Sequence, residues 1–313
     1  MNRIIKHITL LLAIALMLSC RAGKSVYLFT SFHEPANEGL RFLYSYDAYH
    51  WNAIDHIFIK PEIGDAKIMR DPSIAQEPDG VYHLVWTTGW KNDKGIGYAN
   101  SKDLIHWSAQ QHIEVMGYEP TAVNAWAPEL FYDDEAGDFI MIWASTVPFR
   151  FPKGQEDENN NHRLYYTRTK DFKTFSPTML FLDPGFSVID AEIVKLAKND
   201  YALVMKDNTR PNRNILVAFS NSPLGPYSKY TQRFTEPYSE GPSMTKAGNN
   251  WLIYYDSYRL KRYRAMRTTN FKTFTDMTDS VSVPVGHKHG TIFKVTKKQL
   301  EQLLKAAGQT NKS

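Results

Sequence analysis

Short hydrophobic runs alternate with polar positions along most of the chain, and joints rich in Gly, Asn and Asp separate them. Runs at 81–86, 139–144, 201–205 and 251–255 are each followed by another, at 95–99, 163–167, 215–219 and 263–267. Such runs of five or six residues predict β-strands, and joints such as Asp79-Gly80 predict turns between antiparallel neighbours. The pattern therefore predicts an all-β fold, in which only residues 297–306 form a short helix.

A recurring phrase divides these strands into repeats. It consists of several polar residues that close on His-Trp, Thr-Phe or Pro-Tyr, and its five copies lie at 44–51, 99–107, 167–175, 219–227 and 266–274. Repeats of roughly 40–50 residues, each with a few short strands, are typical of β-propeller blades. The sequence therefore predicts a five-bladed β-propeller.

The two ends of the chain are expected to share one blade. The late strand at 291–295 has no partner after it, and the early strands at 27–32 and 40–45 lack an inner strand of their own. Joining the N-terminal strands to the C-terminal inner strand closes the ring and removes the exposed edges of an open sheet.

The first residues predict export. Arg3 and Lys6 precede an apolar stretch at 8–18 that is too short to span a membrane. The stretch ends at Leu18-Ser19-Cys20, which resembles the lipobox of bacterial lipoproteins, and Cys20 is the only cysteine of the chain. We expect lipid attachment at Cys20; the alternative is an ordinary secretory signal with a chance cysteine.

These features divide the chain into a signal peptide (1–19), a lipid-anchored tether (20–25), a propeller catalytic domain (26–296) and a short C-terminal helix with a tail (297–313). Because Arg21 follows the cysteine and no acidic run comes after it, we expect an outer-membrane lipoprotein facing the periplasm rather than the cell surface. Without residues 1–19 the chain has 35 Lys and Arg against 33 Asp and Glu, a balance that argues against nucleic acid as a partner.

The predicted inner strands share a chemical feature. Each begins with an acidic or imidazole group, within the motifs Arg70-Asp71-Pro72, Trp126-Ala127-Pro128-Glu129, Ile189-Asp190-Ala191, Glu240-Gly241-Pro242 and His289-Gly290. Asp-Pro and Glu-Gly-Pro alone are common turn signals. Their matching positions in successive repeats instead predict one central pocket with several carboxylates, an arrangement suited to glycosidic bond hydrolysis.

This ordered set of motifs resembles glycoside hydrolase family 43, a five-bladed propeller family of arabinofuranosidases, xylosidases, arabinanases and galactanases. The resemblance covers nearly the whole mature chain. It implies that Asp71 is the general base, that Glu240 is the general acid, and that Asp190 orients the acid and modulates its pKa. It also implies inversion, for which base and acid stand roughly 6.5–9.5 Å apart. Glu34 is the second choice for the base.

Other residues are candidates for contact with the substrate, namely Trp126, Glu129, Trp90, His289, Phe32 and Arg264. Trp126 is either a sugar platform or a core aromatic, and Glu129 either lines the pocket or binds backbone amides. The polar insertion at 148–161 either rims the pocket or is a solvated loop.

His289 has two interpretations. The family resemblance implies a calcium ion, held largely through waters on the propeller axis near this histidine, although calcium prefers oxygen ligands. Alternatively, His289 bonds a catalytic carboxylate or a substrate hydroxyl.

The leading prediction is an inverting glycoside hydrolase that acts on plant cell-wall polysaccharide or oligosaccharide. The family resemblance alone favours release of α-L-arabinofuranose over release of β-D-xylose or β-D-galactose. A non-catalytic carbohydrate-binding propeller is one alternative. A glycoside phosphorylase on a related scaffold is another, kept open by Arg70 and the histidines at 287 and 289.

Overall fold

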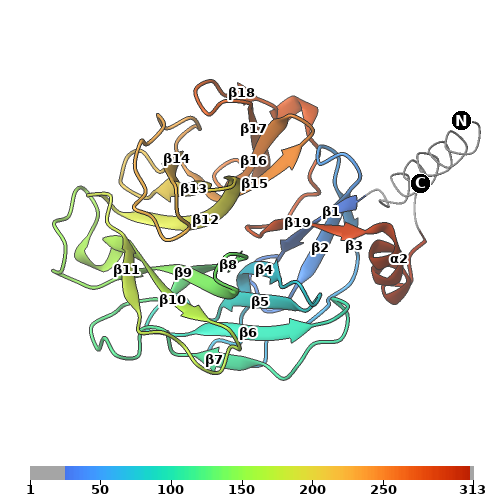
Figure 1. Cartoon of the computed structure of the whole chain (residues 1–313), viewed down its shortest axis with the longest axis horizontal. Helices are drawn as coiled ribbons and strands as arrows, with labels where there is room; N and C mark the ends of the chain where they lie inside the picture. Colours follow the sequence, from blue (N-terminus) through green and yellow to red (C-terminus); the bar gives the residue numbers. More distant parts are fainter. Residues whose placement is uncertain (1–24, 311–313) are drawn as a thin grey trace, which may run out of the picture.

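Five antiparallel sheets surround a central axis in the computed structural model, which describes residues 25–310 (Figure 1). The predicted five-bladed propeller is confirmed. The expectations about the signal peptide, Cys20 and the start of the tether fall on residues 1–24, outside the described part of the chain.

The blades follow one another along the sequence. The blade that holds both chain ends contains β19 (Ile292–Thr296), β1 (Ser25–Ser31), β2 (Arg41–Ser45) and β3 (Asn52–Ile54). The next contains β4 (Arg70–Gln76), β5 (Tyr82–Thr87), β6 (Ile96–Ser101) and β7 (Gln111–Ile113). The third contains β8 (Trp126–Asp133), β9 (Asp138–Thr146), β10 (His162–Thr169) and β11 (Met179–Leu182).

The last two blades differ in strand number. One has only β12 (Val188–Ala197), β13 (Asp200–Asp207) and β14 (Ile215–Ser220). The other has β15 (Ser239–Ala247), β16 (Asn250–Ser257), β17 (Arg262–Thr268) and β18 (Thr275–Asp276). Two short 3-10 helices, η1 (Glu158–Asn160) and η2 (Thr278–Ser280), lie in loops, and α2 (Lys297–Ala306) forms where the sequence predicts a helix. No helix within residues 25–310 is long and apolar enough to cross a membrane.

The ring closes as the sequence predicts. β19 pairs antiparallel with β1, in a register that sets Phe29 opposite Ile292, and β2 lies on the other side of β1. The final helix α2 then packs against the same core through Leu300, Leu303 and Leu304 (Figure 1).

The recurring phrase forms a hydrogen-bonded turn after the third strand of a blade. In the copy at 99–107, the Ser101 hydroxyl accepts the backbone N–H of Leu104 at 2.8 Å, and Asp103 Oδ1 accepts two further N–H groups. Such local side-chain bonds favour turns over continued strand. Equivalent hydroxyl bonds join Ser45 to Ala48, Thr169 to Phe172 and Thr268 to Phe271.

Hydrogen bonds near the axis tie neighbouring blades together. Backbone N–H groups of three inner strands donate to side chains of the preceding blade: Leu130 to Ser73 (3.1 Å), Met244 to Glu192 (2.6 Å) and Ile292 to Ser243 (3.0 Å). These bonds fix the relative positions of the inner strands, and therefore of the side chains at their heads.

Candidate active site

The inner strand of each blade bulges at the same point. Its pairing with the second strand shifts register between Arg70 and Ser73, and equivalent shifts occur at 126–129, 189–192 and 240–243. A bulge re-aims the side chain that it carries, and bulges are common beside active sites. Asp71 and Asp190 both occupy such a bulge with positive φ values of 51° and 50°.

His289 occupies the matching position in the fifth blade. Lys288 faces Phe32 and Ile292 faces Phe29, so three residues on one strand span two on the other. The ring therefore presents Asp71, Asp190 and His289 at one level. Glu240 lies one residue before the equivalent position, which Gly241 fills with φ 56°.

These side chains meet in one cavity of about 760 Å³. Residues of all five blades line it, and they include the predicted site residues Phe32, Asp71, Trp90, Trp126, Asp190, Glu240 and His289. The structure thus brings together groups that are more than 200 residues apart in the sequence.

Asp71 lies between a hydroxyl and an imidazole. Thr87 Oγ1 donates to its Oδ2 at 2.8 Å, and Nδ1 of His289 lies 3.3 Å from its Oδ1. Burial alone would raise the pKa of Asp71, but His289, Arg70 and Thr87 together lower it below its ordinary value. Asp71 is therefore a carboxylate at neutral pH, as a general base must be.

His289 is the complementary cation. Burial alone would lower its pKa, but the hydrogen bond and charge of Asp71, with the charges of Asp190 and Glu129, raise the pKa to about 9. Of the two interpretations of this histidine, contact with a candidate catalytic carboxylate is the one that the geometry shows.

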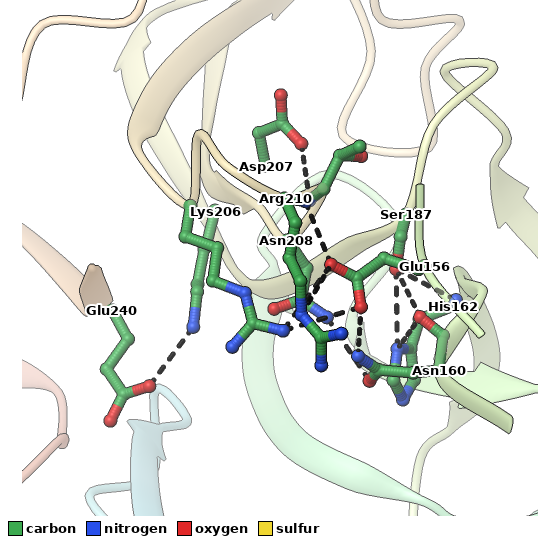
Figure 2. Close-up of polar contacts among 11 residues, drawn as sticks. Glu156, Asn160, His162, Ser187, Lys206, Asp207, Asn208, Arg210 and Glu240 are labelled. Atoms are coloured by element: carbon green, nitrogen blue, oxygen red, sulfur yellow. Dashed lines mark hydrogen bonds and ion pairs between the residues drawn. The ribbon is translucent and has the colours of Figure 1, made fainter. Parts of the chain in front are cut away.

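Asp190 and Glu240 are linked through the backbone. Asp190 Oδ2 accepts the N–H of Gly241, the residue after Glu240, at 3.0 Å. Burial raises the pKa of Asp190, with His289 and Lys206 opposing and the charges of Glu240 and Asp71 adding to the rise. The Glu240 side chain is about one-third exposed (32%), and its Oε2 accepts a bond from Lys206 Nζ at 3.1 Å (Figure 2).

One side of the pocket is aromatic. The guanidinium of Arg70 lies 4.2 Å from the ring centre of Trp90 and 5.0 Å from that of Phe32, and it donates to Glu34 at 2.6 Å. Glu34, the rival for the base, is thus held in an ion pair. Trp90 remains 57% exposed, and the indole N–H of Trp126 donates to its carbonyl at 2.9 Å.

Two predicted contacts lie away from the pocket lining. Glu129 is buried, and its Oε2 accepts the Thr291 hydroxyl at 3.2 Å. It neither lines the pocket nor accepts a backbone amide, and burial raises its pKa to about 7. Arg264 is not brought to the pocket, because its guanidinium is taken up by Glu236 at 2.9 Å and by Asp276 of its own blade.

The sequence analysis missed most of a second, polar wall of the pocket. The insertion at 148–161 does reach the pocket, through Asp157, Asn159 and Asn160. It meets the turn between β13 and β14, which contributes Arg210 and Arg213. The only sequence signals were the length and polarity of the insertion and the two arginines around Pro211-Asn212.

A buried carboxylate joins these two segments. Glu156 accepts the backbone N–H of Arg210 at 2.9 Å and lies 3.4 Å from the guanidinium of Arg213, and Asn160 also donates to it (Figure 2). The carbonyl of Asn160 in turn accepts the Ser187 hydroxyl at 2.8 Å. The wall is therefore a hydrogen-bonded unit.

The described residues do not form a direct metal site. Within 25–310, no group of three or more His, Cys, Asp and Glu side chains is arranged to hold a metal ion. Nδ1 of His289 already faces Asp71. The calcium that the family resemblance implies stays a prediction, and the proposed chemistry contains no step through it.

Known proteins match this chain in sequence and in fold. The model of a family described as "probable glycosyl hydrolase domain", related to glycoside hydrolase family 43, matches residues 24–301. An α-L-arabinofuranosidase of Bifidobacterium longum is 25% identical over 149 residues, which cover 41% of this chain and 14% of that protein. The chain thus spans a small part of that relative.

Solved structures share the propeller. An α-L-arabinanase of Cellvibrio cellulosa matches with a TM-score of 0.58 and 16% identity, over 84% of this chain and 96% of that one. An exo-β-1,3-galactanase of Phanerochaete chrysosporium matches with a TM-score of 0.58 and 17% identity, over 79% and 58%. These similarities establish the fold, and the family match covers nearly the whole described chain. The chain therefore belongs to the family of glycosyl hydrolase domains related to glycoside hydrolase family 43.

Proposed function

We propose that this enzyme hydrolyses its glycoside with inversion, with Asp71 as general base and Glu240 as general acid. The observation that carries the proposal is the difference between the two carboxyl groups in one pocket. Asp71 is largely buried, ionised and held by Thr87 and His289, whereas Glu240 is about one-third exposed on another blade. Glycoside hydrolysis uses two carboxyl groups in distinct environments, and inversion follows when the ionised one activates water instead of attacking the sugar.

In the proposed reaction, water lies between Asp71 and the anomeric carbon. Asp71 accepts a proton as the water oxygen forms its bond to that carbon. The electron pair of the breaking glycosidic bond goes to the leaving oxygen, which takes a proton from Glu240. Attack from the face opposite the leaving group inverts the anomeric centre.

The neighbouring residues have supporting roles in this proposal. His289 keeps Asp71 in its ionised form and fixes one of its oxygens. Asp190 holds the backbone beside Glu240 by accepting the N–H of Gly241. It also interacts electrostatically with both reacting carboxyl groups, Asp71 and Glu240. The sugar would lie against the aromatic side of the pocket, where Trp90 and Trp126 offer ring surface.

For the substrate we propose plant cell-wall polysaccharide or oligosaccharide, with release of α-L-arabinofuranose. Two of the similar proteins are named for action on arabinose-containing glycans, an arabinofuranosidase and an arabinanase, and a third is a galactanase. β-D-Galactose and β-D-xylose are therefore the alternatives to test beside arabinose. The lipid anchor at Cys20 and the outer-membrane location belong to the same proposal, since they would hold the enzyme where such oligosaccharides arrive.

The first experiment compares wild type with Asp71→Asn on aryl α-L-arabinofuranoside, β-D-xyloside and β-D-galactoside. Wild type should hydrolyse one of them, and Asp71→Asn should lower kcat at least about 10³-fold, because an activated aryl leaving group bypasses the acid but not the base. Asp134→Asn is the matched control, since Asp134 is an exposed carboxylate paired with Lys195. NMR of the first-formed anomer tests inversion.

Other outcomes would replace the proposal. Full activity in Asp71→Asn would exclude this base. Turnover that requires inorganic phosphate would indicate a phosphorylase. Binding of the oligosaccharide without any turnover would indicate a carbohydrate-binding propeller.

A further inference from the structure

A lysine that the sequence analysis did not single out lies beside the proposed acid. Lys206 is at the end of β13, its side chain is 3% exposed, and its Nζ lies 3.1 Å from Glu240 Oε2. Figure 2 shows it reaching from one blade toward Glu240 on the next. In the strand pairing Lys206 faces Ile189, and in the β4–β7 blade Thr87 faces Arg70. Lys206 therefore occupies the same position in its blade as Thr87, the residue whose hydroxyl bonds Asp71.

The charge of this lysine is retained despite its burial. Burial alone would lower the pKa of Lys206, but the charges of Glu240 and Asp190 outweigh it and raise the pKa above its ordinary value. The ammonium also lies 5.2 Å from the ring centre of Tyr258. Lys206 is therefore a buried cation in contact with the proposed acid.

This contact determines which oxygen of Glu240 can carry a proton. An ammonium has only donors, so the oxygen that it bonds must be an acceptor. In a protonated carboxyl group the carbonyl oxygen is the better acceptor, so the contact at Oε2 favours a proton on Oε1. The ammonium also stabilises the negative charge that forms on the carboxyl group as that proton leaves, and preorganised charge of this kind lowers the barrier.

We propose that Lys206 is a positioning residue for proton donation. It presents Oε1 of Glu240 to the leaving oxygen and stabilises the carboxylate that proton transfer produces. In that step the Oε1–H bond breaks, the leaving oxygen gains the proton, and the Lys206 ammonium keeps all of its own protons. The inference rests on the proposed role of Glu240 as the acid.

The chain contains a matched lysine away from the pocket. Lys195 Nζ lies 2.6 Å from Asp134 Oδ1 and 5.8 Å from the ring centre of Tyr201, so it too combines a carboxylate with a tyrosine ring. It does not line the cavity. Lys195→Met therefore measures the effect of losing a lysine–carboxylate contact that does not involve Glu240.

The experiment measures kcat/KM of wild type, Lys206→Met, Lys206→Arg and Lys195→Met. The substrates are aryl glycosides of the sugar that wild type hydrolyses, with phenols that range from dinitrophenol to unactivated phenol. Unactivated phenol needs protonation as it leaves, so Lys206→Met should lower kcat/KM about 10²-fold on that substrate and only a few-fold on the dinitrophenyl glycoside. Lys206→Arg keeps charge and donors and should restore much of the loss, and Lys195→Met should match wild type.

Several results would overturn the proposal. An equal loss on all phenols would mean that Lys206 supports the fold or substrate binding and not the acid, and unchanged rates would mean that it has no role. If Lys206→Met fails to fold, as thermal unfolding would show, the same dependence on the phenol is sought in Lys206→Gln. Wild-type activity decides the proposed function separately: if wild type hydrolyses none of the glycosides, that function fails and this inference fails with it.

Discussion

The floor and the wall of the pocket are built in different ways. The floor consists of the inner-strand heads Asp71, Asp190, Glu240 and His289, which the repeated register shift places around the axis. The wall consists of the insertion at 148–161 and the β13–β14 turn, which join through Glu156 (Figure 2). The floor is fixed by backbone pairing within each blade, whereas the wall is held by side-chain hydrogen bonds, most of them to one buried carboxylate. The floor therefore suits chemistry that demands exact placement, and the wall can change without altering the sheets.

The largest expected effect comes from removing the Glu156 carboxylate that joins the two segments of the wall. Glu156→Ala leaves Arg213 and the N–H of Arg210 without their common acceptor, and removing one partner of a buried ion pair costs about 3–5 kcal/mol. We expect the free energy of unfolding in urea to fall by that amount. Because the floor is untouched, KM should rise more than kcat falls.

Glu135→Ala is the control, because Glu135 is exposed and lies 3.8 Å from Lys195. It should leave stability and kinetics unchanged. A Glu156→Ala enzyme with wild-type stability would show that the wall does not depend on this carboxylate. A fall in kcat equal to that of a floor variant would show that floor and wall act as one unit.

The contrast also explains what the sequence could predict. Asp71, Asp190, Glu240 and His289 were predictable because each lies in a short motif at or beside the same point of successive inner strands. The second-strand residues that face the last paired residue before each register shift have no shared type: they are Thr87, Ala144, Lys206 and Asp256. Lys206 therefore gave no repeated signal, although it contacts the proposed acid.

Non-repeated segments were harder to place. The short outer strands β3, β7, β11 and β18 have two to four residues, too few for a hydrophobic period. Arg264 belongs to a basic run whose partners come from other segments, so local sequence could not show that Glu236 and Asp276 bind it. The insertion is linked to the β13–β14 turn by contacts more than 50 residues apart in the chain.

A substitution in the floor that leaves the wall unchanged is expected to have the next largest effect. Asp190→Ala removes the acceptor of the Gly241 N–H and the charge between Asp71 and Glu240. We expect kcat to fall about 10³-fold, a loss typical of removing one preorganised group, with the free energy of unfolding changed far less than in Glu156→Ala. Steady-state kinetics and urea unfolding measure both.

Asp190→Asn separates position from charge. The asparagine oxygen can still accept the Gly241 N–H, so this variant should keep more activity than Asp190→Ala if placement of Glu240 matters most. Equal losses in the two variants would assign the effect to the charge of Asp190. Wild-type kcat in both would remove Asp190 from the proposed mechanism.

The smallest expected effect concerns Glu129, which is buried against Thr291 outside the pocket lining. Burial raises its pKa from 4.5 in the unfolded chain to about 7. The folded state therefore binds more protons between these values, and wild-type stability falls as pH rises from about 4.5 to 7. The side chain introduced by Glu129→Gln cannot ionise, and its oxygen still accepts a hydrogen bond. This variant should therefore be more stable than wild type by up to about 3 kcal/mol at pH 8 and no more stable at pH 4.5.

Urea unfolding of both proteins at the two pH values measures the difference, with Glu135→Gln as the exposed control. A difference independent of pH would mean that Glu129 titrates normally. Because Glu129 lies outside the pocket lining, kcat should stay near wild type, and a large loss would mean that Glu129 contributes to the active site.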